Sequence, residues 1–348
     1  MKNILKKIDE IARKIKRDIN LMEVCGTHTQ AAARYGIREL MPKNIHLTTG
    51  PGCPVCVTAQ EDIDAIASLA LAGVPIATYG DMMRVPGFYG SLDQAREKGA
   101  KVFDVYSTED ALKLQKKYPN LVFFGLGFET TTPMTAYAIK KGLTVYSTHK
   151  LFLPAMEALL KIGELKIDGY ICPGHVSAII GTEPYKSMNV PQVITGFTAE
   201  DVLVGIYMLL RQISEKRAEV ENEYLRVVRK EGNKNAYKEI MEVFDIKDGN
   251  WRGFGIIPKS GLEIKEKYAK FDAKIKYKNI LSEVDFSKSR KPTGCKCGEI
   301  IRGLKAPSKC PMFKKVCMPE NPIGSCMVSP EGACNVEYRY NLKIKMKK

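Results

Sequence analysis

The chain has 348 residues, enough for two or three domains with full hydrophobic cores, which excludes a single small module. Its 45% hydrophobic and 27% charged residues are ordinary globular values that argue against global disorder, although 54 Lys and Arg against 39 Asp and Glu leave a formal charge of +15. No apolar run reaches the roughly 18 residues of a membrane span, and the charged N-terminus lacks the uncharged core of a secretion signal, so we expect a soluble, cytoplasmic protein.

Short apolar runs alternate with helix-patterned stretches between residues 20 and 200, which is typical of an α/β protein with parallel sheets. Before them, isoleucines at helical spacing predict an amphipathic helix (Ile4, Ile8, Ile11 and Ile15). Eight strands are expected: Leu21–Val24, Ile45–Thr48, Pro75–Tyr79, Lys101–Val105, Leu121–Gly125, Leu143–Ser147, Gly169–Ile171 and Pro191–Ile194. Four strands fall on each side of residue 118, so we predict two similar α/β/α halves, residues 1–118 and 119–245, that face a cleft. Residues 246–348 are expected to form a third, Cys-rich domain.

Most of these strands end in small, polar turns that contain glycine. Ligands of open parallel sheets bind outside the carboxyl ends of the strands, so these turns are expected to line one functional crevice. The turns with candidate functional residues are Cys25–Thr29, Gly50–Cys56, Gly127–Thr131 and Pro173–Ser177.

Cys53 and Cys56 form a Cys-x-x-Cys motif between a predicted strand and a predicted helix. Two thiols at this spacing can hold a reversible disulfide, and a helix N-terminus stabilises the thiolate. Half of a zinc knuckle is the main alternative, but no second pair follows at the usual spacing in this half. The motif therefore favours a redox or metal-handling role.

Cys25 and His28 lie three residues apart on another strand-to-helix turn. A thiolate with a nearby imidazole is either an activated nucleophile or an open-site ligand for a soft metal such as low-spin Fe(II). The structural alternative is a buried cysteine beside Thr and His side chains that only cap the next helix. The residues alone leave both hypotheses open.

Glu129 and His175 are further candidates, each on a glycine-containing turn. Glu129 is either a general acid or base, or an acidic residue that matches the dipole of a helix capped by threonines. His175 has the same two interpretations. Cys172 follows an apolar run and is expected to be a buried core thiol.

The C-terminal region carries the strongest signal, since six of the ten cysteines follow residue 294. In a chain without a secretion signal, cysteines favour metal ligation or redox chemistry over a disulfide framework. Four thiolates suit either an iron–sulfur cluster or zinc, and the absence of tight C-x2-C knuckles favours the cluster. The four are Cys295, Cys310, Cys317 and Cys334, which leave Cys297 and Cys326 as a candidate redox-active pair.

The composition and the cysteines also suggest two other functions. A basic nucleic-acid-binding protein with a zinc-bound tail is disfavoured because the positive charge is scattered among acidic residues. A freestanding iron–sulfur thiol–disulfide reductase acting on a diffusible substrate is compatible with the cysteines. Neither a phosphate-binding loop nor a dinucleotide fingerprint is present in the sequence.

Taken together, the motifs resemble the HypD family of [NiFe]-hydrogenase maturation proteins. The matching segments are Cys25–Thr29, Gly50–Cys56, Gly127–Thr131, Pro173–Ser177, Gly294–Gly298, Cys326–Ser329 and Glu331–Cys334. They follow the family's order from about residue 20 to 335, with no departure at a motif position.

The resemblance implies a metallocofactor assembly scaffold with thiol redox activity. The family assembles an Fe(CN)2(CO) unit with the small chaperone HypC, and receives cyanide from HypE; no nucleic acid or membrane partner is expected. Cys25 resembles the family's iron-binding cysteine, and His28 an essential neighbour. Cys53 and Cys56 match a thiol pair near that site. The resemblance also implies that Cys295, Cys310, Cys317 and Cys334 are the ligands of a 4Fe-4S cluster. It implies a disulfide between Cys297 and Cys326 beside that cluster. Our own hypothesis is that Glu129 and His175, at the wall of the cleft, either support the iron ligands or handle protons.

Overall fold

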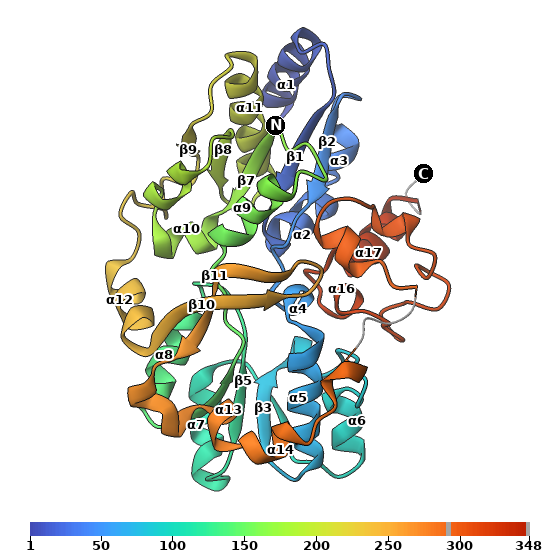
Figure 1. The fold of residues 1–348 in the computed structure, drawn as a ribbon. Helices are drawn as coiled ribbons and strands as arrows, with labels where there is room; N and C mark the ends of the chain where they lie inside the picture. Colours follow the sequence, from blue (N-terminus) through green and yellow to red (C-terminus); the bar gives the residue numbers. More distant parts are fainter. Residues whose placement is uncertain (290–293, 346–348) are drawn as a thin grey trace.

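The computed structural model of the chain describes residues 1–289 and 294–345. Two parallel sheets form two lobes, an upper and a lower one in the view of Figure 1. The upper sheet has the order β2-β1-β7-β8-β9, with β1 (Ile19–Glu23), β2 (Ile45–Thr49), β7 (Gly169–Pro173), β8 (Gln192–Thr195) and β9 (Val220–Asn222). The lower sheet has the order β4-β3-β5-β6, with β3 (Ile76–Tyr79), β4 (Val102–Val105), β5 (Val122–Gly125) and β6 (Thr144–Ser147). The expected α/β class and all eight expected strands are confirmed.

The division of the chain between the lobes differs from the expected boundary at residue 118. Residue 118 lies between α7 (Thr108–Lys117) and β5, inside the lower lobe. The upper sheet combines strands from both sides of this lobe, because β1 pairs with β7 through Leu21 and Gly169. The physical reason is that β1 is almost entirely buried and takes a partner strand on each side, β2 and β7. The lower lobe is thus inserted between the two parts of the upper one.

Helices cover both sheets. In the upper lobe, α1 packs on α11 through Ile8 and Ala12, which confirms the amphipathic N-terminal helix. The helices of this lobe are α1 (Lys2–Lys14), α2 (Gly26–Arg34), α3 (Ile37–Leu40), α9 (Leu153–Ile162), α10 (Gly174–Ile180), η2 (Glu183–Ser187) and α11 (Ala199–Ser214). Those of the lower lobe are α5 (Gln60–Leu71), η1 (Gly80–Met82), α6 (Leu92–Glu97), α7 and α8 (Thr132–Lys140). The short helix α4 (Pro54–Val57) lies between the lobes (Figure 1).

An antiparallel hairpin that the sequence analysis missed crosses the junction of the lobes. Its strands are β10 (Phe244–Trp251) and β11 (Gly255–Ile264), and α12 (Lys234–Val243) precedes them. Trp251 is buried, stacks with Phe128 at a ring distance of 5.8 Å, and donates its indole N–H to Ser260. The following helices pack on β6 and α5 of the lower lobe: η3 (Glu266–Phe271), α13 (Ala273–Lys276) and α14 (Lys278–Ser282). η4 (Phe286–Lys288) ends this segment.

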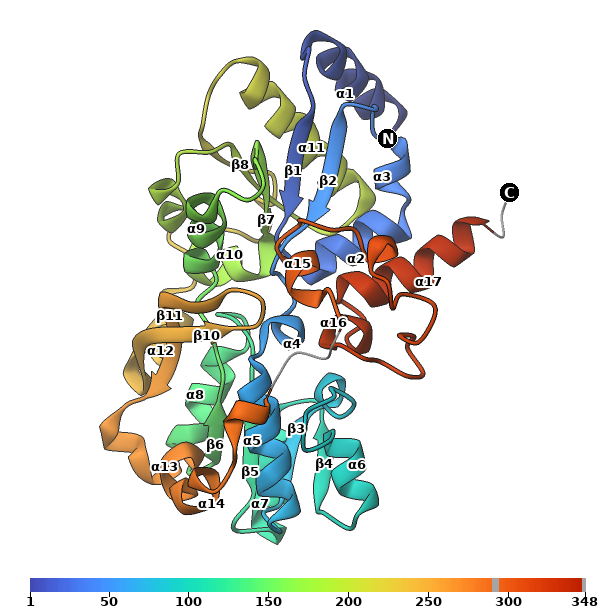
Figure 2. The ribbon, with the colours of Figure 1, turned by 45° about the vertical axis from the view of Figure 1, so that its right-hand side comes forward.

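The expected third domain, residues 246–348, therefore divides into two parts. Only the segment from residue 294 onward forms what we call the Cys-rich lobe, residues 294–345, seen beside α2 and α4 in Figure 2. Its helices are α15 (Cys297–Ile301), η5 (Pro307–Lys309), α16 (Ser325–Val328) and α17 (Ala333–Lys345). Across the parts of the chain with assigned structure, no helix is both long and apolar enough to cross a membrane.

The Cys-rich lobe is bonded to both α/β lobes. Thr27 of the upper lobe donates a hydrogen bond to Glu331, and Ser329 donates one to Asp81 of the lower lobe. Arg84, also of the lower lobe, donates to two backbone carbonyls of the Cys-rich lobe, at residues 319 and 320. These bonds place the C-terminal cysteines where the two α/β lobes meet.

Candidate functional site

Cys25 occupies the carboxyl end of β1, where it is the N-terminal cap of α2. Hydrogen bonds from Thr27 and His28 lower the pKa of its thiol, as expected for a sulfur at a helix N-terminus. Burial has the larger effect, and together with the nearby Glu331 carboxylate it raises the pKa to about 12. A bound cation is therefore needed to hold this sulfur as a thiolate at neutral pH.

The turn before Cys53 packs directly on Cys25. A side-chain carbon on Gly52 would lie 2.3 Å from the Cys25 Cα atom, and the Gly26 N–H donates to the Gly52 carbonyl. Only glycine allows this approach between two backbones. The two cysteine-containing turns that the sequence predicted to share a crevice are thus in contact.

His28 is fully buried beneath this turn. Its Nε2 lies 2.9 Å from both the Gly196 carbonyl and the Thr195 hydroxyl, and because a carbonyl only accepts, Nε2 carries the proton. Its Nδ1 is buried and has no hydrogen-bond partner in residues 1–289 and 294–345. Burial lowers the pKa of His28 to about 4, so the ring is a neutral base whose free acceptor atom is Nδ1.

A phenylalanine that the sequence analysis did not select joins the two candidate histidines. Phe197 stacks with His28 at a ring distance of 4.7 Å and with His175 at 4.0 Å. His175 is exposed, whereas His28 is not. The structure therefore brings Cys25, His28 and His175 together at the carboxyl edge of the upper sheet.

Cys53 and Cys56 form a disulfide within α4, with both sulfurs buried. The Cys56 carbonyl accepts a hydrogen bond from Ser325 of the Cys-rich lobe. The Cys297 sulfur lies 3.7 Å from the same Ser325 hydroxyl and 2.6 Å from the Cys326 sulfur. The two cysteine pairs thus belong to adjoining segments, with Ser325 between them.

Arg252, which the sequence did not single out, holds α4 in this position. The N–H of Arg252, at the tip of the hairpin, donates to the Val57 carbonyl, and its guanidinium donates to Thr58 and Gln60. Because α4 has only four residues, these bonds to the hairpin hold the Cys-x-x-Cys turn against the Cys-rich lobe.

The four cysteines expected to bind a cluster line one small internal cavity, together with the Cys297 and Cys326 pair. Three are buried and Cys310 is half-buried. Burial first, and then the neighbouring cysteines, raise the pKa of Cys295 to about 11, and the pKa values of Cys317 and Cys334 rise for the same causes. Thiols crowded in this way become thiolates together only around a strong positive charge, which fits a metal group. Within the described ranges, no three Cys, His, Asp or Glu side chains already stand in the geometry of a metal site.

Glu129 lies at the start of the lower lobe's α8 region and is buried. One carboxylate oxygen accepts from the Phe152 N–H at 3.1 Å, and the other has no hydrogen-bond partner in the described part of the chain. Burial raises the pKa of Glu129 to about 7. Glu129 lines a cavity of about 520 Å³ beside α12. Within the described residues, no hydrogen bond connects Glu129 to Cys25. The expected role of Glu129 in proton transfer stays a prediction.

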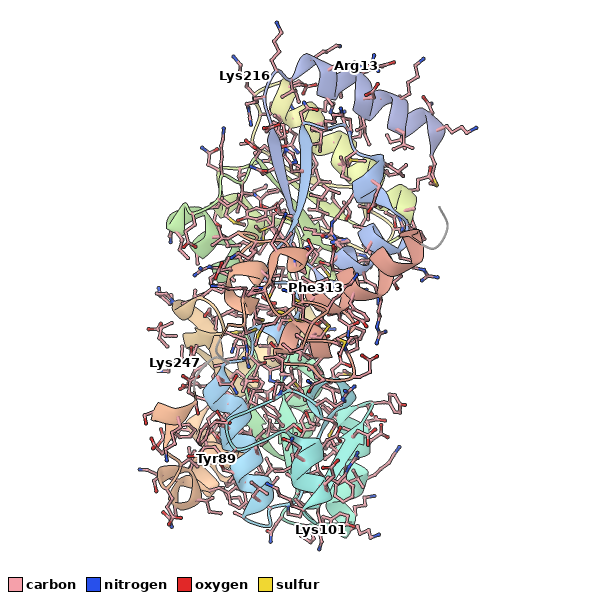
Figure 3. All side chains as sticks on the ribbon, turned by 90° about the vertical axis from the view of Figure 1, so that its right-hand side faces the viewer. Arg13, Tyr89, Lys101, Lys216, Lys247 and Phe313 are labelled. Atoms are coloured by element: carbon pink, nitrogen blue, oxygen red, sulfur yellow. A yellow bond between two sulfur atoms is a disulfide. The ribbon has the colours of Figure 1, made fainter. Side chains whose placement is uncertain are left out.

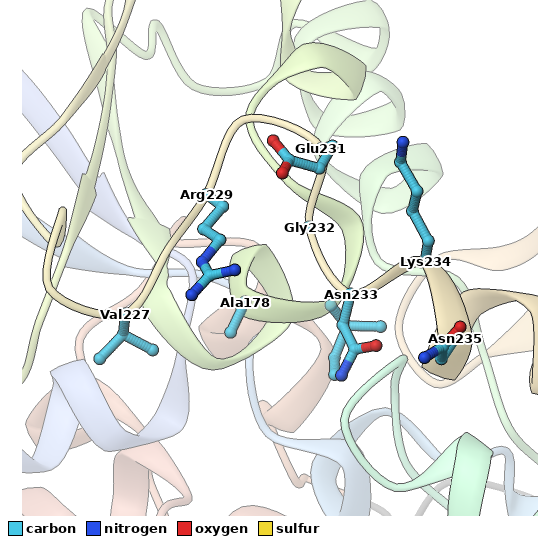
Figure 4. A pocket seen from close by; sticks show the side chains of 9 residues that line it. Ala178, Val227, Arg229, Glu231, Gly232, Asn233, Lys234 and Asn235 are labelled. Atoms are coloured by element: carbon cyan, nitrogen blue, oxygen red, sulfur yellow. The ribbon is translucent and has the colours of Figure 1, made fainter.

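Two other features lie outside this site. Cys172 is fully buried in β7, which confirms the expectation of a core thiol. An open groove of about 610 Å³ runs between α10 and the segment before α12 and is lined by Arg229, Asn233 and Lys234 among others (Figure 4). None of the predicted site residues lines this groove.

Glu331, too, was missed as a site residue. It lies so close to α2 that a side-chain carbon on Gly26 would be 2.6 Å from the Glu331 Cβ atom. In the sequence, Glu331 stands out only as part of the motif that ends in Cys334. No pattern in the residues reveals that it contacts a turn near the N-terminus.

Comparisons with known proteins agree with these motifs. The family model described as "HypD: Hydrogenase formation hypA family" matches residues 1–341. The chain is 43% identical to hydrogenase maturation factor HypD2 of Bradyrhizobium diazoefficiens, over 93% of this chain and 90% of that protein. It is 43% identical to a putative hydrogenase expression/formation protein of Methanocaldococcus jannaschii, over 98% and 97%. Hydrogenase maturation factor HypD of Escherichia coli is 40% identical over 93% and 90%. The chain therefore belongs to the HypD family of hydrogenase maturation factors.

Proposed function

We propose that this protein is the scaffold on which the Fe(CN)2(CO) unit of [NiFe]-hydrogenase is assembled. In this proposal Cys25 binds the iron as its substrate, a HypC-type chaperone supplies a partner surface, and a HypE-type protein supplies cyanide. The observation that carries the proposal is the contact of the Cys25 turn with both the Cys53–Cys56 turn and the Cys-rich lobe.

The surroundings of Cys25 suit a soft metal substrate. Cys25 lies at the N-terminus of α2, whose backbone N–H groups favour a thiolate, and thiolate is the ligand that low-spin Fe(II) prefers. Among the described residues nothing bonds to the unprotonated Nδ1 of His28 in the same turn, so this atom can accept a proton during assembly. His175, stacked on Phe197, is the exposed histidine of this group and would exchange that proton with solvent. We propose a similar proton-handling role for Glu129, from the lower lobe.

The Cys-rich lobe would hold a 4Fe-4S cluster through Cys295, Cys310, Cys317 and Cys334. When bound, such a cluster supplies one-electron redox chemistry. The residues of the chain itself then provide two buried sulfur pairs on the route toward Cys25. Ser325, which contacts Cys297 and bonds to the Cys56 carbonyl, keeps those two pairs in adjoining segments.

A freestanding reductase is the less supported alternative. Cys53, Cys56, Cys297 and Cys326 are all buried, with exposed fractions of 6%, 1%, 4% and 1%. A diffusible disulfide substrate would have to reach one of these sulfurs, since thiol–disulfide exchange is a direct attack of sulfur on sulfur. Their burial supports electron transfer within the protein.

The proposal is tested by infrared spectroscopy of the protein purified without oxygen together with a HypC-type partner. We expect bands of iron-bound CO and cyanide that are lost in Cys25→Ala. Cys172→Ala is the matched control, because it removes another buried thiol from the same lobe. Bands that persist in Cys25→Ala, or that disappear in both variants, would contradict the assignment of Cys25.

A further inference from the structure

The segment that carries two of the cluster cysteines is strongly basic. Residues 305–317 contain four lysines and no acidic residue. Lys305 pairs with Glu299 at 2.8 Å, but Lys309, Lys314 and Lys315 are exposed and form no ion pair within the described ranges of the chain. Figure 3 views the molecule from the side of this segment, with Phe313 labelled at its centre. These three lysines therefore place three positive charges on this face, none of them in a salt bridge with a carboxylate of the described residues.

Lys314 and Lys315 are held by a tight turn. The N–H of Cys317 donates to the Met312 carbonyl, and the N–H of Lys314 donates to the Cys317 carbonyl. Lys314 adopts a φ of 60°, and its ammonium lies 5.4 Å from the Phe313 ring centre. The charges are thus attached to a defined backbone beside an exposed apolar side chain, Val316, which is 50% exposed.

The same turn connects the surface with the cysteine cavity. Cys310, beside Lys309, is the one half-buried member of the four proposed cluster cysteines, and Cys317 follows Val316 directly. At the other end, Cys297 and Cys326 face Ser325 and the Cys56 carbonyl of α4. The Cys-rich lobe therefore has an outer, lysine-bearing end and an inner end that contacts the Cys-x-x-Cys turn.

We propose that the face formed by Lys309, Lys314, Lys315 and Val316 is the docking surface of a small acidic protein that carries a one-electron redox group. The inference rests on the proposed function, because it makes this face the entry point of electrons for the Cys-rich lobe. Each docked carrier gives up one electron and is oxidised. Two such encounters, with two protons, supply what converts the Cys53–Cys56 disulfide to two thiols.

The composition of the face suits this class of partner. Opposite charges on two proteins raise their rate of encounter, and the effect falls steeply with salt. Electron-transfer complexes are short-lived and bury less than about 1,200 Å² in total, so a few lysines around one apolar contact are sufficient. A neutral or basic carrier would gain nothing from these lysines.

The direct test measures binding of an acidic [2Fe-2S] ferredoxin to the full chain, purified without oxygen, by biolayer interferometry at several salt concentrations. The variant is Lys309→Glu/Lys314→Glu/Lys315→Glu. The matched control is Lys113→Glu/Lys116→Glu/Lys117→Glu, three exposed lysines of α7 in the lower lobe, which changes the net charge equally. We expect the association rate at low salt to fall about tenfold or more in the first variant and much less in the control. Equal losses in both variants, or binding that is insensitive to salt, would overturn the proposal.

A second measurement separates this inference from the proposed function. Reduction of the chain by the pre-reduced ferredoxin is followed by stopped-flow absorbance, while the absorbance of each variant before mixing reports whether a cluster is present. If no variant contains a cluster, the proposed function fails, and the binding data still decide on the docking surface. If the cluster is present and the triple variant is reduced as fast as the control, the docking surface is wrong although the cluster is right.

Discussion

Thr27 and Glu331 are 304 positions apart in the chain, and the Thr27 hydroxyl donates a 2.8 Å hydrogen bond to the Glu331 carboxylate. The bond joins the turn of the candidate iron-binding cysteine to the segment that ends in Cys334. Burial, the largest effect, raises the pKa of Glu331, and the Thr27 hydroxyl opposes it. One carboxylate thereby acts on the Cys25 thiol and holds the Cys-rich lobe in place.

Replacing the two partners of this bond should affect the pKa of Cys25 differently. Glu331→Gln removes a negative charge that raises the pKa of Cys25, so the pKa should fall. Thr27→Val keeps that negative charge and removes only the hydroxyl bonded to Glu331, so the pKa of Cys25 should not fall. The measurement is the pH dependence of iodoacetamide alkylation at Cys25 in the metal-free protein, resolved by peptide mass spectrometry. Shifts of the same sign in both variants would rule out this electrostatic arrangement.

Gly52 should tolerate no side chain. In Gly52→Ala the new methyl group would lie 2.3 Å from the Cys25 Cα atom, and backbone cannot move aside cheaply. Overpacking of this kind costs about 1–3 kcal/mol in the free energy of unfolding. Gly80→Ala is the control, since nothing lies within 4 Å of its added carbon. Urea unfolding should show the loss only at Gly52, and equal stability of the two variants would contradict the close approach.

The strands of this fold could be predicted from local sequence, whereas their pairing could not. Most of the buried strands are short apolar runs that end near glycine, and that signal is contained in the run itself. The pairing of Leu21 with Gly169 depends on the lower lobe being inserted between them, which no local pattern encodes. The hairpin was missed because Lys247, Gly249 and Lys259 interrupt its apolar alternation.

In the candidate site, too, some residues could be predicted from local sequence and others could not. Cys25, His28 and the Cys53–Cys56 pair could be predicted because thiols and imidazole at fixed short spacings have a recognisable chemistry. Phe197 and Glu331 could not, because an aromatic ring and a carboxylate gain their roles only from what they touch after folding. Arg252 is a similar case, since its partners Val57, Thr58 and Gln60 precede it by almost 200 residues.

Glu129 should make the protein less stable as the pH rises. Its pKa is raised by burial from 4.5 to about 7, so the folded state binds a proton that the unfolded state releases. Stability from this group is complete below about pH 4.5 and is lost as the pH rises toward 7. Each unit of difference corresponds to about 1.4 kcal/mol, so the total loss is at most a few kcal/mol. Glu129→Gln should therefore gain stability relative to the parent between pH 5 and pH 8, as measured by urea unfolding.

Buried histidines change the free energy of unfolding with pH in the opposite direction to Glu129. For this reason the stability of Glu129→Gln is compared with that of the parent at each pH. Burial lowers the pKa of His28 to about 4 and that of His149 to about 3, so both favour unfolding as the pH falls below about 6.5. These contributions cancel in the difference between Glu129→Gln and the parent. Glu109→Gln, on the surface of α7, is the control for loss of a carboxylate. If the difference in the free energy of unfolding between Glu129→Gln and the parent does not change with pH, Glu129 is ionised throughout this range and the prediction is wrong.

Arg84 should govern how firmly the Cys-rich lobe is attached to the lower lobe. Its guanidinium donates to the Pro319 and Glu320 carbonyls at 2.7 and 2.9 Å, and because both bonds are exposed to solvent they should contribute about 1 kcal/mol or less. Arg84→Ala should raise amide hydrogen exchange around residues 318–324, with the strands of both sheets unchanged. Arg96→Ala is the control, because it removes an exposed ion pair of the same lobe, with Asp93. Unchanged exchange in Arg84→Ala would mean that the bonds of Ser329 and Glu331 suffice to hold the lobe, and exchange that rises throughout the sheets would mean that Arg84 stabilises the lower lobe itself.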